Sequence, residues 1–246
     1  MKALILAAGF GKRLQPLTNM IPKSMVPVKG VPLIVRSMHK IQTLGVSSFV
    51  LVTGHKADYI QTKLGCFFGE LPVVYILNPD YETTNNIYSL WLAADKMDDD
   101  ICLFECDLLY SEQLLQLLSK SDADCTIVTS DFNSETMDGS VIQVDAAGNA
   151  LDLYLKKEQY PGFDYSDKKK TVNIYKFSKR FLSEALVPAL KAEIDAGNLS
   201  SYYESVLKDI MKNGRWDIKV LNVPESLWCE IDDHDDLARA EESGLL

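Results

Sequence analysis

The sequence has few of the residues on which several common chemistries depend. Its 246 residues include three histidines and five cysteines, at positions 66, 102, 106, 125 and 229, with no paired metal spacing. We therefore expect no histidine-based mechanism, and we interpret the cysteines as free, mostly buried thiols of a cytoplasmic protein. No apolar run reaches the roughly 20 residues that span a bilayer. Glycines and charges interrupt the N-terminus, so we expect neither membrane insertion nor a leader peptide.

Acidic residues are missing from the first part of the chain. Residues 1–57 carry eight Lys or Arg and no Asp or Glu, whereas the remainder carries 17 basic and 35 acidic residues, for a formal net charge of −10. An acidic protein repels polyanions, which argues against nucleic-acid binding. One basic segment suits a single small anion instead, and the acidic remainder can supply carboxylates for a divalent cation.

Two common glycine motifs are also missing at the start of the chain. The apolar run Ala3–Ala7, typical of a buried parallel strand, leads into Gly9-Phe10-Gly11-Lys12-Arg13. Leu14 stands where a dinucleotide fingerprint has its third glycine, no acidic residue occurs before Asp58, and a Walker A loop needs a different spacing. An ordinary glycine turn is the remaining alternative. The neighbouring basic residues, with Lys23, favour a loop whose N–H groups and cations bind a triphosphate.

This N-terminal segment resembles the signature of nucleoside-triphosphate transferases that activate sugar phosphates and small alcohol phosphates. Residues 6–18, LAAGFGKRLQPLT, followed by Pro22-Lys23, fit that signature position by position. The resemblance implies catalytic roles for Arg13 and Lys23, with Lys23 facing the α-phosphate and the acceptor. It also implies that the nucleotide is bound by Leu6, Ala7, Ala8, Gly9, Gly11, Lys12 and Arg13.

The rest of the chain alternates between strand-like and helix-like segments. Further strands are expected at residues 48–53, 72–77, 101–106, 123–130, 171–177 and 217–223, a hairpin at 140–154, and helices at 33–44, 57–64, 87–97, 178–196 and 200–213. This alternation predicts an α/β fold, a Rossmann-like mostly parallel sheet with flanking helices and ligands at its C-terminal edge. The resemblance adds a small appended acceptor-binding region.

We expect one domain, residues 1–246, in which 1–135 mainly bind the nucleotide and 136–246 mainly bind the acceptor. Related enzymes can be fused to a transaminase, so the chain is compatible with one domain of a longer protein. It is equally compatible with a homo-oligomer.

The polar loop before residues 87–97 is a candidate for reading the base. Asparagine offers a donor and an acceptor together, which suits the edge of a pyrimidine. The same residues, 83–86, could instead cap the following helix. The run NNIYSL at 85–90 is similar to one in phosphocholine cytidylyltransferases, where the loop lies over the nucleotide. That resemblance favours a CTP-binding role for Asn85, Asn86 and Ser89.

Two aspartates are candidate ligands of Mg²⁺. Asp107 follows the apolar run 101–106, and Asp232 ends the segment WCEID at 228–232. A carboxylate at the C-terminal end of a strand is a good ligand for a hard cation, although Asp107 could also cap the next helix. The family resemblance makes both residues metal ligands and places Asp107 beside the nucleotide, whereas Glu105 is a weaker candidate.

The acceptor pocket is less well defined. Tyr202, Tyr203 and Glu204 could line a pocket for a cationic head group, or could simply be a helix start with aromatic core residues. In sugar-phosphate relatives a lysine near Lys156 contacts the acceptor phosphate, and a solvated basic pair is the alternative. The acceptor-binding candidates are Lys23, Lys156, Asn173, Tyr202, Tyr203, Glu204 and Glu230.

The sequence therefore predicts a Mg²⁺-dependent cytidylyltransferase. It would move CMP from CTP to a small amino-alkyl phosphonate or phosphate, with 2-aminoethylphosphonate favoured over phosphocholine by overall resemblance. A sugar-1-phosphate nucleotidyltransferase using UTP or dTTP is the alternative; the 85–90 loop, the short chain and Asn173, where many such relatives carry glycine, argue against it. A non-catalytic nucleotide-sensing module would be expected to lose Lys23 or a metal carboxylate, and both are present.

Overall fold

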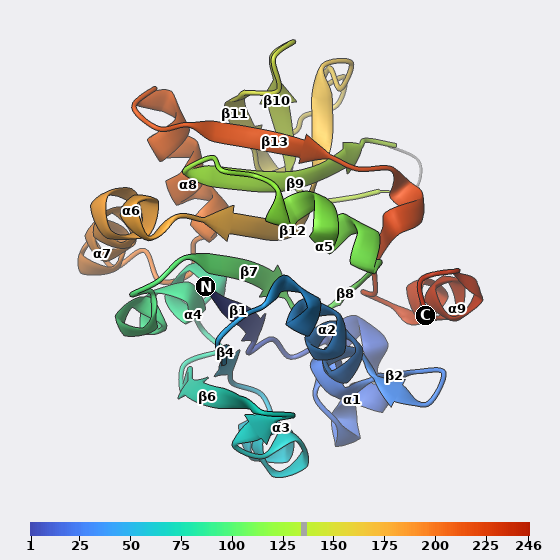
Figure 1. Ribbon diagram of the computed structural model, residues 1–246. Helices are drawn as coiled ribbons and strands as arrows, with labels where there is room; N and C mark the ends of the chain where they lie inside the picture. Colours follow the sequence, from blue (N-terminus) through green and yellow to red (C-terminus); the bar gives the residue numbers. More distant parts are fainter. Residues whose placement is uncertain (134–136) are drawn as a thin grey trace.

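One ten-stranded sheet runs through the molecule and carries helices on both faces (Figure 1). The computed structural model describes residues 1–133 and 137–246. Along the main path the strands follow the order β11-β10-β12-β7-β1-β4-β6-β5, with β9 beside β12 and β13 beside β9. The predicted α/β fold with a large sheet and flanking helices is confirmed.

The N-terminal half supplies the parallel part of the sheet. Its strands are β1 (Lys2–Ala7), β4 (Phe49–Thr53), β6 (Leu71–Leu77) and β7 (Ile101–Glu105), and β1 pairs in parallel with both β4 and β7. Residues 3–7 are buried, which explains the continuous apolar run. Leu4 and Leu6 join the core on one face, and Ala3, Ile5 and Ala7 that on the other.

The C-terminal half extends the sheet with antiparallel pairs. The strand β12 (Lys168–Phe177) lies antiparallel to β7, to β10 (Val141–Val144) and to β9 (Cys125–Asp131). The strand β11 (Ala150–Tyr154) pairs with β10, and β13 (Ile218–Asn222) runs parallel to β9. Between Thr171 and Tyr175 the register of β12 shifts, and Asn173 there has φ of 60°. Asparagine tolerates this left-handed conformation better than most non-glycine residues.

Three short strand pairs complete the structure, and one of them joins segments that are far apart in the sequence. The strand β14 (Trp228–Glu230) pairs with β8 (Leu108–Tyr110), β2 (Pro27–Val28) pairs with β3 (Val31–Pro32), and β5 (Phe67–Phe68) pairs with β6. Beyond β14, the N–H of Ile231 donates to the carbonyl of Asp107 at 2.8 Å. This pairing carries the acidic C-terminal segment to the end of β7.

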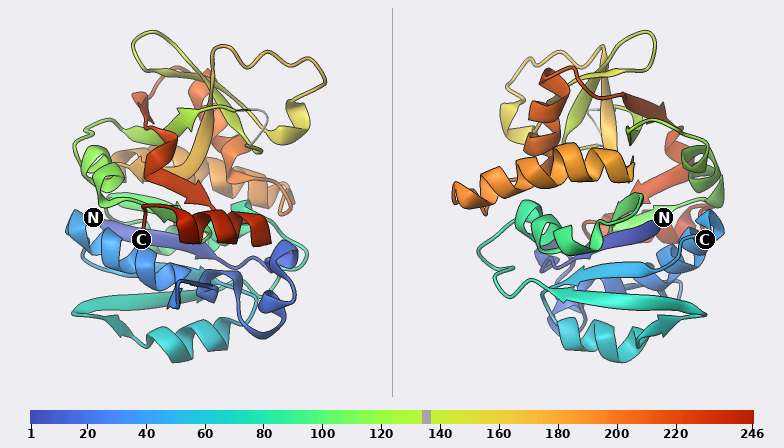
Figure 2. Two further views of the ribbon diagram at one scale, coloured as in Figure 1. Left: turned by 90° about the vertical axis from the view of Figure 1, so that its right-hand side faces the viewer. Right: turned by 60° about the vertical axis from the view of Figure 1, so that its left-hand side comes forward.

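Helices cover both faces of the sheet. One core contains residues of α4 (Asn86–Leu92), α6 (Lys179–Phe181), α7 (Val187–Asp195) and α8 (Tyr203–Lys212); the other contains residues of α2 (Leu33–Ile41), α3 (Ala57–Leu64) and α5 (Glu112–Ser119). The short α1 (Leu17–Met20) follows the glycine loop, and α9 (His234–Glu242) ends the chain. Figure 2 shows α9, in red, beside the blue N-terminal segments, where a third apolar cluster joins the two ends.

The boundaries predicted from sequence need some correction. The helix expected at 57–64 is confirmed, whereas that at 87–97 ends at Leu92 and gives way to a 3₁₀ turn at 94–96. The helix expected at 178–196 contains a π-helical turn at 182–186. The helix expected at 200–213 begins at Tyr203, with Tyr202 as its N-cap residue. The sheet is continuous through both halves of the chain, and the expected division at 135/136 lies outside the described residues.

The cysteines are all free thiols, with three of them buried, at 102, 106 and 125. Across residues 1–133 and 137–246, no helix combines the length and apolar character needed to cross a membrane.

Candidate functional site

A cavity of about 360 Å³ opens at the C-terminal ends of β1 and β7. We call it the first cavity. The two strands lie side by side there, with Leu6 opposite Glu105. The cavity is lined by Leu6, Ala8, Gly9, Gly11, Lys12, Arg13, Lys23, Asn78, Tyr81, Thr84, Asn85, Asn86, Ser89, Glu105, Cys106, Asp107, Tyr202 and Asp232. The sequence-predicted nucleotide residues therefore gather around one space, apart from Ala7, which is buried in the core.

The backbone conformation of Gly11 and its close approach to Lys23 both require glycine at this position. Gly11 has φ of 68°, a left-handed conformation, and its carbonyl accepts hydrogen bonds from Thr18 Oγ1 at 2.8 Å and from the N–H of Leu14 at 3.1 Å. A Cβ at Gly11 would lie 2.8 Å from Cβ of Lys23. Because that separation is shorter than real Cβ contacts, a side chain at position 11 would push Lys23 out of place.

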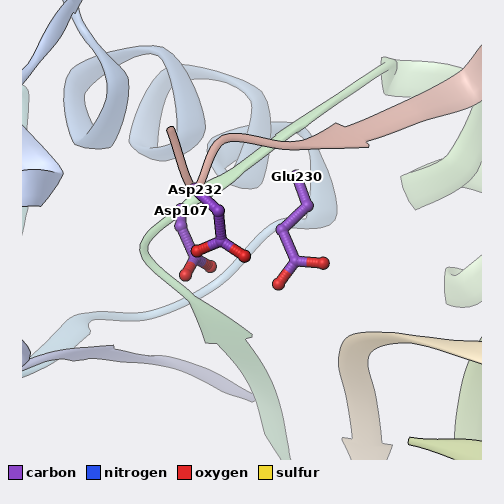
Figure 3. Close-up of side chains that lie close together, drawn as sticks. All are labelled: Asp107, Glu230 and Asp232. Atoms are coloured by element: carbon purple, nitrogen blue, oxygen red, sulfur yellow. The ribbon is translucent and has the colours of Figure 1, made fainter. Parts of the chain in front are cut away.

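Three carboxylates meet at the edge of this cavity. Asp107, Glu230 and Asp232 each offer an oxygen within 4.8 Å of the others (Figure 3). Lys23 Nζ lies 2.7 Å from Oδ2 of Asp107 and 2.6 Å from Oδ1 of Asp232, and Arg13 Nη2 lies 2.9 Å from Oδ2 of Asp232. Two cations therefore bind the carboxylates that the sequence predicted as metal ligands.

The donor set suits a hard divalent cation. The cluster offers only carboxylate oxygens, which are the ligands that Mg²⁺ and Ca²⁺ prefer. Asp107 Oδ1 is buried and has no hydrogen-bond partner within the described part of the chain. An unpartnered buried carboxylate oxygen is costly, so a cation at this point would satisfy it. Glu230, which the sequence suggested for the acceptor, thus lies with the metal candidates.

Burial and charge shift the ionisation of these groups. Burial alone would lower the pKa of Lys23, but Asp107 and Asp232 outweigh it and hold the pKa well above its usual value. Lys23 therefore stays an ammonium ion. Burial raises the pKa of Glu230 to about 7, although Lys170 opposes the shift. Burial also raises the pKa of Glu105 well above its usual range, and Asp107 adds to this.

The polar loop serves the helix as well as the cavity. Asn85 caps α4, with its Oδ1 accepting from the N–H of Asn86 at 2.8 Å, as the capping alternative predicted. Ser89 Oγ accepts from Asn78 Nδ2 at 3.0 Å. Ser111 caps α5 by accepting from the N–H of Leu114, which leaves Asp107 to face the cavity.

Asn86 anchors a buried network beneath the first cavity. Its Nδ2 lies 3.4 Å from Glu105 Oε1 and 3.2 Å from Glu204 Oε2, and its Oδ1 accepts from the N–H of Tyr203 at 3.0 Å. Tyr203 also donates its hydroxyl to Glu105 at 3.1 Å. The amide of Asn86 is therefore engaged within the protein, and it positions the loop against α8.

The acceptor candidates do not gather in one place. Tyr202 is 42% exposed and lines the first cavity, whereas Tyr203 and Glu204 lie in the core, at 0% and 5% exposure. Lys156 is on the surface, 2.6 Å from Asp138, and Asn173 lies in the irregular part of β12. Only Lys23, Tyr202 and Glu230 of this set line either cavity described here.

A second cavity of about 670 Å³ adjoins the first and shares Arg13 and Asp232 with it. Its other lining residues are Met137, Asp138, Gly139, Lys170, Glu225, Trp228, Cys229, Glu230, Asp233, Asp236 and Arg239. Sequence reasoning missed Lys170. The run of three lysines at 168–170 could have indicated it, because alternate residues of a strand face opposite sides of the sheet.

Known proteins match nearly the whole chain. A family model described as Nucleotidyl transferase matches residues 2–243. The chain is 31% identical over 243 residues to a CMP-5′-(3-aminopropyl)phosphonate synthase of Streptomyces rubellomurinus; the match covers 98% of this chain and 38% of that protein. It is 27% identical over 264 residues to a CTP:phosphoglutamine cytidylyltransferase of Campylobacter jejuni, covering 96% of this chain and 98% of that protein.

Among solved structures, the CTP:phosphocholine cytidylyltransferase of Streptococcus pneumoniae superposes with a TM-score of 0.77 at 22% identity, covering 98% of this chain and 97% of that one. At that identity the likeness shows the fold alone. The family match, in contrast, spans nearly the whole chain. The chain therefore belongs to the nucleotidyl transferase family.

Proposed function

We propose that the chain is a cytidylyltransferase that transfers CMP from CTP to a small amino-alkyl phosphonate or phosphate and releases pyrophosphate. The observation that carries this proposal is the position of Lys23. Its ammonium contacts Asp107 and Asp232 beside the glycine loop, at a point where the two cavities share Arg13 and Asp232. The first cavity would take the nucleotide, and the second would take the acceptor.

The reaction needs little covalent help from the protein. An ionised acceptor oxygen attacks the α-phosphorus of CTP, a new P–O bond forms, and the bond to the pyrophosphate oxygen breaks with its electron pair. Because the acceptor is already an anion near neutral pH, no side chain has to remove a proton. The protein contributes position and charge neutralisation.

Different residues of the first cavity would bind the phosphates, neutralise charge and hold the metal ion. The N–H groups of the glycine loop and the Arg13 side chain would bind the β- and γ-phosphates. Lys23, held as an ammonium ion, would neutralise charge on the α-phosphate and the acceptor oxygen. Asp107 and Asp232, with Glu230 beside them, would hold Mg²⁺. When bound, the ion would offset the negative charge of the triphosphate.

The choice of acceptor rests on the relatives. One is named for a CMP-aminopropylphosphonate product and another for a CTP-dependent transfer to phosphoglutamine. Both names describe a cytidine nucleotide and an acceptor with an amino group. We favour 2-aminoethylphosphonate as the acceptor of this chain, with phosphocholine second.

A matrix of substrates tests the proposal. Purified protein with MgCl₂ would be given CTP, UTP or dTTP together with 2-aminoethylphosphonate, 3-aminopropylphosphonate, phosphocholine or glucose 1-phosphate, and pyrophosphate release would be measured. We expect the fastest release with CTP and an aminoalkylphosphonate. Faster release with UTP or dTTP and glucose 1-phosphate would replace this proposal with the sugar-nucleotide alternative.

A further inference from the structure

Three cationic side chains line the second cavity, and one of them is buried. The side chains of Arg13 and Arg239 are 66% and 68% exposed and are paired with Asp232 and Asp236. The side chain of Lys170 is 3% exposed. Water solvates a surface guanidinium when no ligand is bound. A buried ammonium needs hydrogen-bond acceptors or an opposite charge from the groups around it.

Within residues 1–133 and 137–246, the protein satisfies the Lys170 ammonium only in part. An ammonium group carries three N–H donors. The Nζ atom of Lys170 donates to the carbonyl of Thr171 at 2.7 Å, and its ion-pair contact with Glu230 Oε2 is 3.8 Å long. That separation exceeds hydrogen-bond length. A ligand oxygen in the cavity would therefore give Lys170 a closer partner than Glu230 does.

A glycine borders the Lys170 ammonium in the wall of the cavity. Gly139 lines the cavity and has φ of 104°, a conformation that side chains rarely adopt. A Cβ built at Gly139 would lie 3.1 Å from Lys170 Nζ. Any side chain at position 139 would therefore crowd the ammonium group, and glycine leaves room there for a ligand atom.

The surroundings of Lys170 place it close to the reacting groups. Glu230, its distant ion-pair partner, belongs to the carboxylate cluster with Asp107 and Asp232. An anion bound by Lys170 would thus lie next to the point where the α-phosphate is expected. Lys170 Nζ also lies 5.9 Å from the centroid of the Trp228 ring. This ring therefore already faces a cation of the protein.

From this geometry we propose that Lys170 binds an acidic oxygen of the acceptor, a phosphonate or phosphate, in the second cavity. The inference rests on the proposed function, because it assigns the acceptor to this cavity. It gives Lys170 the role that family resemblance suggested for Lys156, which lies on the surface beside Asp138. Lys170 is then a specificity-determining residue that selects acceptors by their anionic end.

Calorimetry on variants tests this assignment without turnover. The protein would be saturated with MgCl₂ and α,β-methylene-CTP, whose α–β bridge cannot be cleaved, and titrated with 2-aminoethylphosphonate and with methylphosphonate. We expect Lys170→Met to weaken both acceptor ligands by about tenfold to a hundredfold, as for a lost hydrogen bond to a charged group. Its affinity for the nucleotide analogue should fall less than its affinity for the acceptors, because Lys170 reaches the carboxylate cluster only through Glu230, at 3.8 Å.

The matched control is Lys169→Met. Lys169 is the preceding residue of β12, and its Nζ lies 2.6 Å from Asp131 on the surface, so this variant should bind both acceptors normally. Thermal unfolding would establish that the variants fold. Lys170→Gln, which keeps a donor for the Thr171 carbonyl, would replace Lys170→Met if the latter does not fold.

Wild-type acceptor affinity in both Lys170 variants would overturn the inference, as would loss of binding in Lys156→Met alone. Failure of the proposed function gives a different result. If the wild-type enzyme uses glucose 1-phosphate and not a phosphonate, and Lys170→Met loses affinity for glucose 1-phosphate, the proposed acceptor is wrong but the anion-binding role of Lys170 is supported.

Discussion

Lys23 Nζ lies 2.6 Å from Oδ1 of Asp232, a residue 209 positions later in the chain. The contact depends on the β8–β14 pair, which brings the C-terminal acidic segment to the end of β7. Because Lys23 also contacts Asp107, the two aspartates share one cation in this structure. They should therefore behave as a unit when a different cation binds.

We expect Asp107→Asn and Asp232→Asn to have strongly non-additive effects. Two carboxylates facing a triphosphate would repel it unless a divalent ion lies between them. Each single substitution should lower kcat/KM by about a thousandfold, and the double variant should lose little more, since the same ion is lost each time. Pyrophosphate release by the three variants, with and without EDTA, measures this.

The control for this experiment is Asp58→Asn. Asp58 lies in the first turn of α3 and lines neither cavity as the structure describes them. Its activity should stay near that of the wild type. Additive losses at positions 107 and 232, with turnover persisting in EDTA, would contradict the shared-metal interpretation.

Removing Arg13 should mainly weaken CTP binding. Its guanidinium is 66% exposed and lines both cavities, where it can reach phosphates both before and during reaction. We expect Arg13→Ala to raise KM for CTP by about tenfold to a hundredfold with a smaller change in kcat. Steady-state kinetics on this variant and on Lys63→Ala, in the distant helix α3, would measure both constants. A collapse of kcat at unchanged KM would instead assign Arg13 to the transition state.

The sequence predicted the fold best where local pattern and burial coincide. The run at 3–7 is buried on both faces of the sheet, and its continuous apolar character predicted β1. The start of β12 was missed, because Lys168–Lys170 looks unlike a strand until β10 and β9 supply its partners. Strand propensity depends on such neighbours.

The sequence likewise predicted the parts of the site that depend on neighbouring residues and missed the parts that depend on distant ones. The glycine loop and Lys23 lie within a few residues of one another, so their motif predicted a shared location, and they do line one cavity. The orientation of Asn86 depends on Tyr203, 117 positions away. The burial of Lys170 depends on the pairing of β12 with β10 and β9, and Gly139 borders its ammonium group. Sequence spacing carries no information about such long-range contacts.

Base selection can be tested at Asn85, whose side chain lines the first cavity. Asn85 Oδ1 is engaged in capping α4, so its Nδ2 group is the part that can donate to N3 of cytosine, which uracil cannot accept because its N3 carries a hydrogen. Asn85→Asp keeps the cap and removes that donor. We expect kcat/KM for CTP to fall by about tenfold and that for UTP to change little.

Thr83→Ala is the control for this substitution. Thr83 belongs to the same loop and donates to the carbonyl of Asp80, but it does not line the first cavity as the structure describes it. It should leave the ratio of CTP to UTP activity unchanged. An equal fall for both nucleotides in Asn85→Asp would show that Asn85 supports the loop without reading the base.

The last prediction concerns stability and pH at Glu204. Burial raises the pKa of this carboxyl above its usual value, and Asn86 Nδ2 contacts it at 3.2 Å. The folded protein thus holds a proton that the unfolded chain releases near pH 4.5, so stability falls as pH rises from that value towards the folded pKa. Glu204→Gln cannot ionise and can still accept from Asn86. Its free energy of unfolding, relative to wild type, should therefore rise by up to about 1.4 kcal/mol per pH unit over that window.

Urea unfolding of wild type and Glu204→Gln at pH 4.5, 6 and 8 would measure this difference. The matched control is Glu184→Gln, the same substitution at an exposed position of the π-helical turn, where 49% of the side chain is accessible. A gap between wild type and Glu204→Gln that stays constant from pH 4.5 to 8 would mean that Glu204 is ionised in the fold. In that case the Asn86 contact would have to stabilise a buried carboxylate, and replacing Asn86 with leucine should then destabilise the protein more at pH 8 than at pH 4.5.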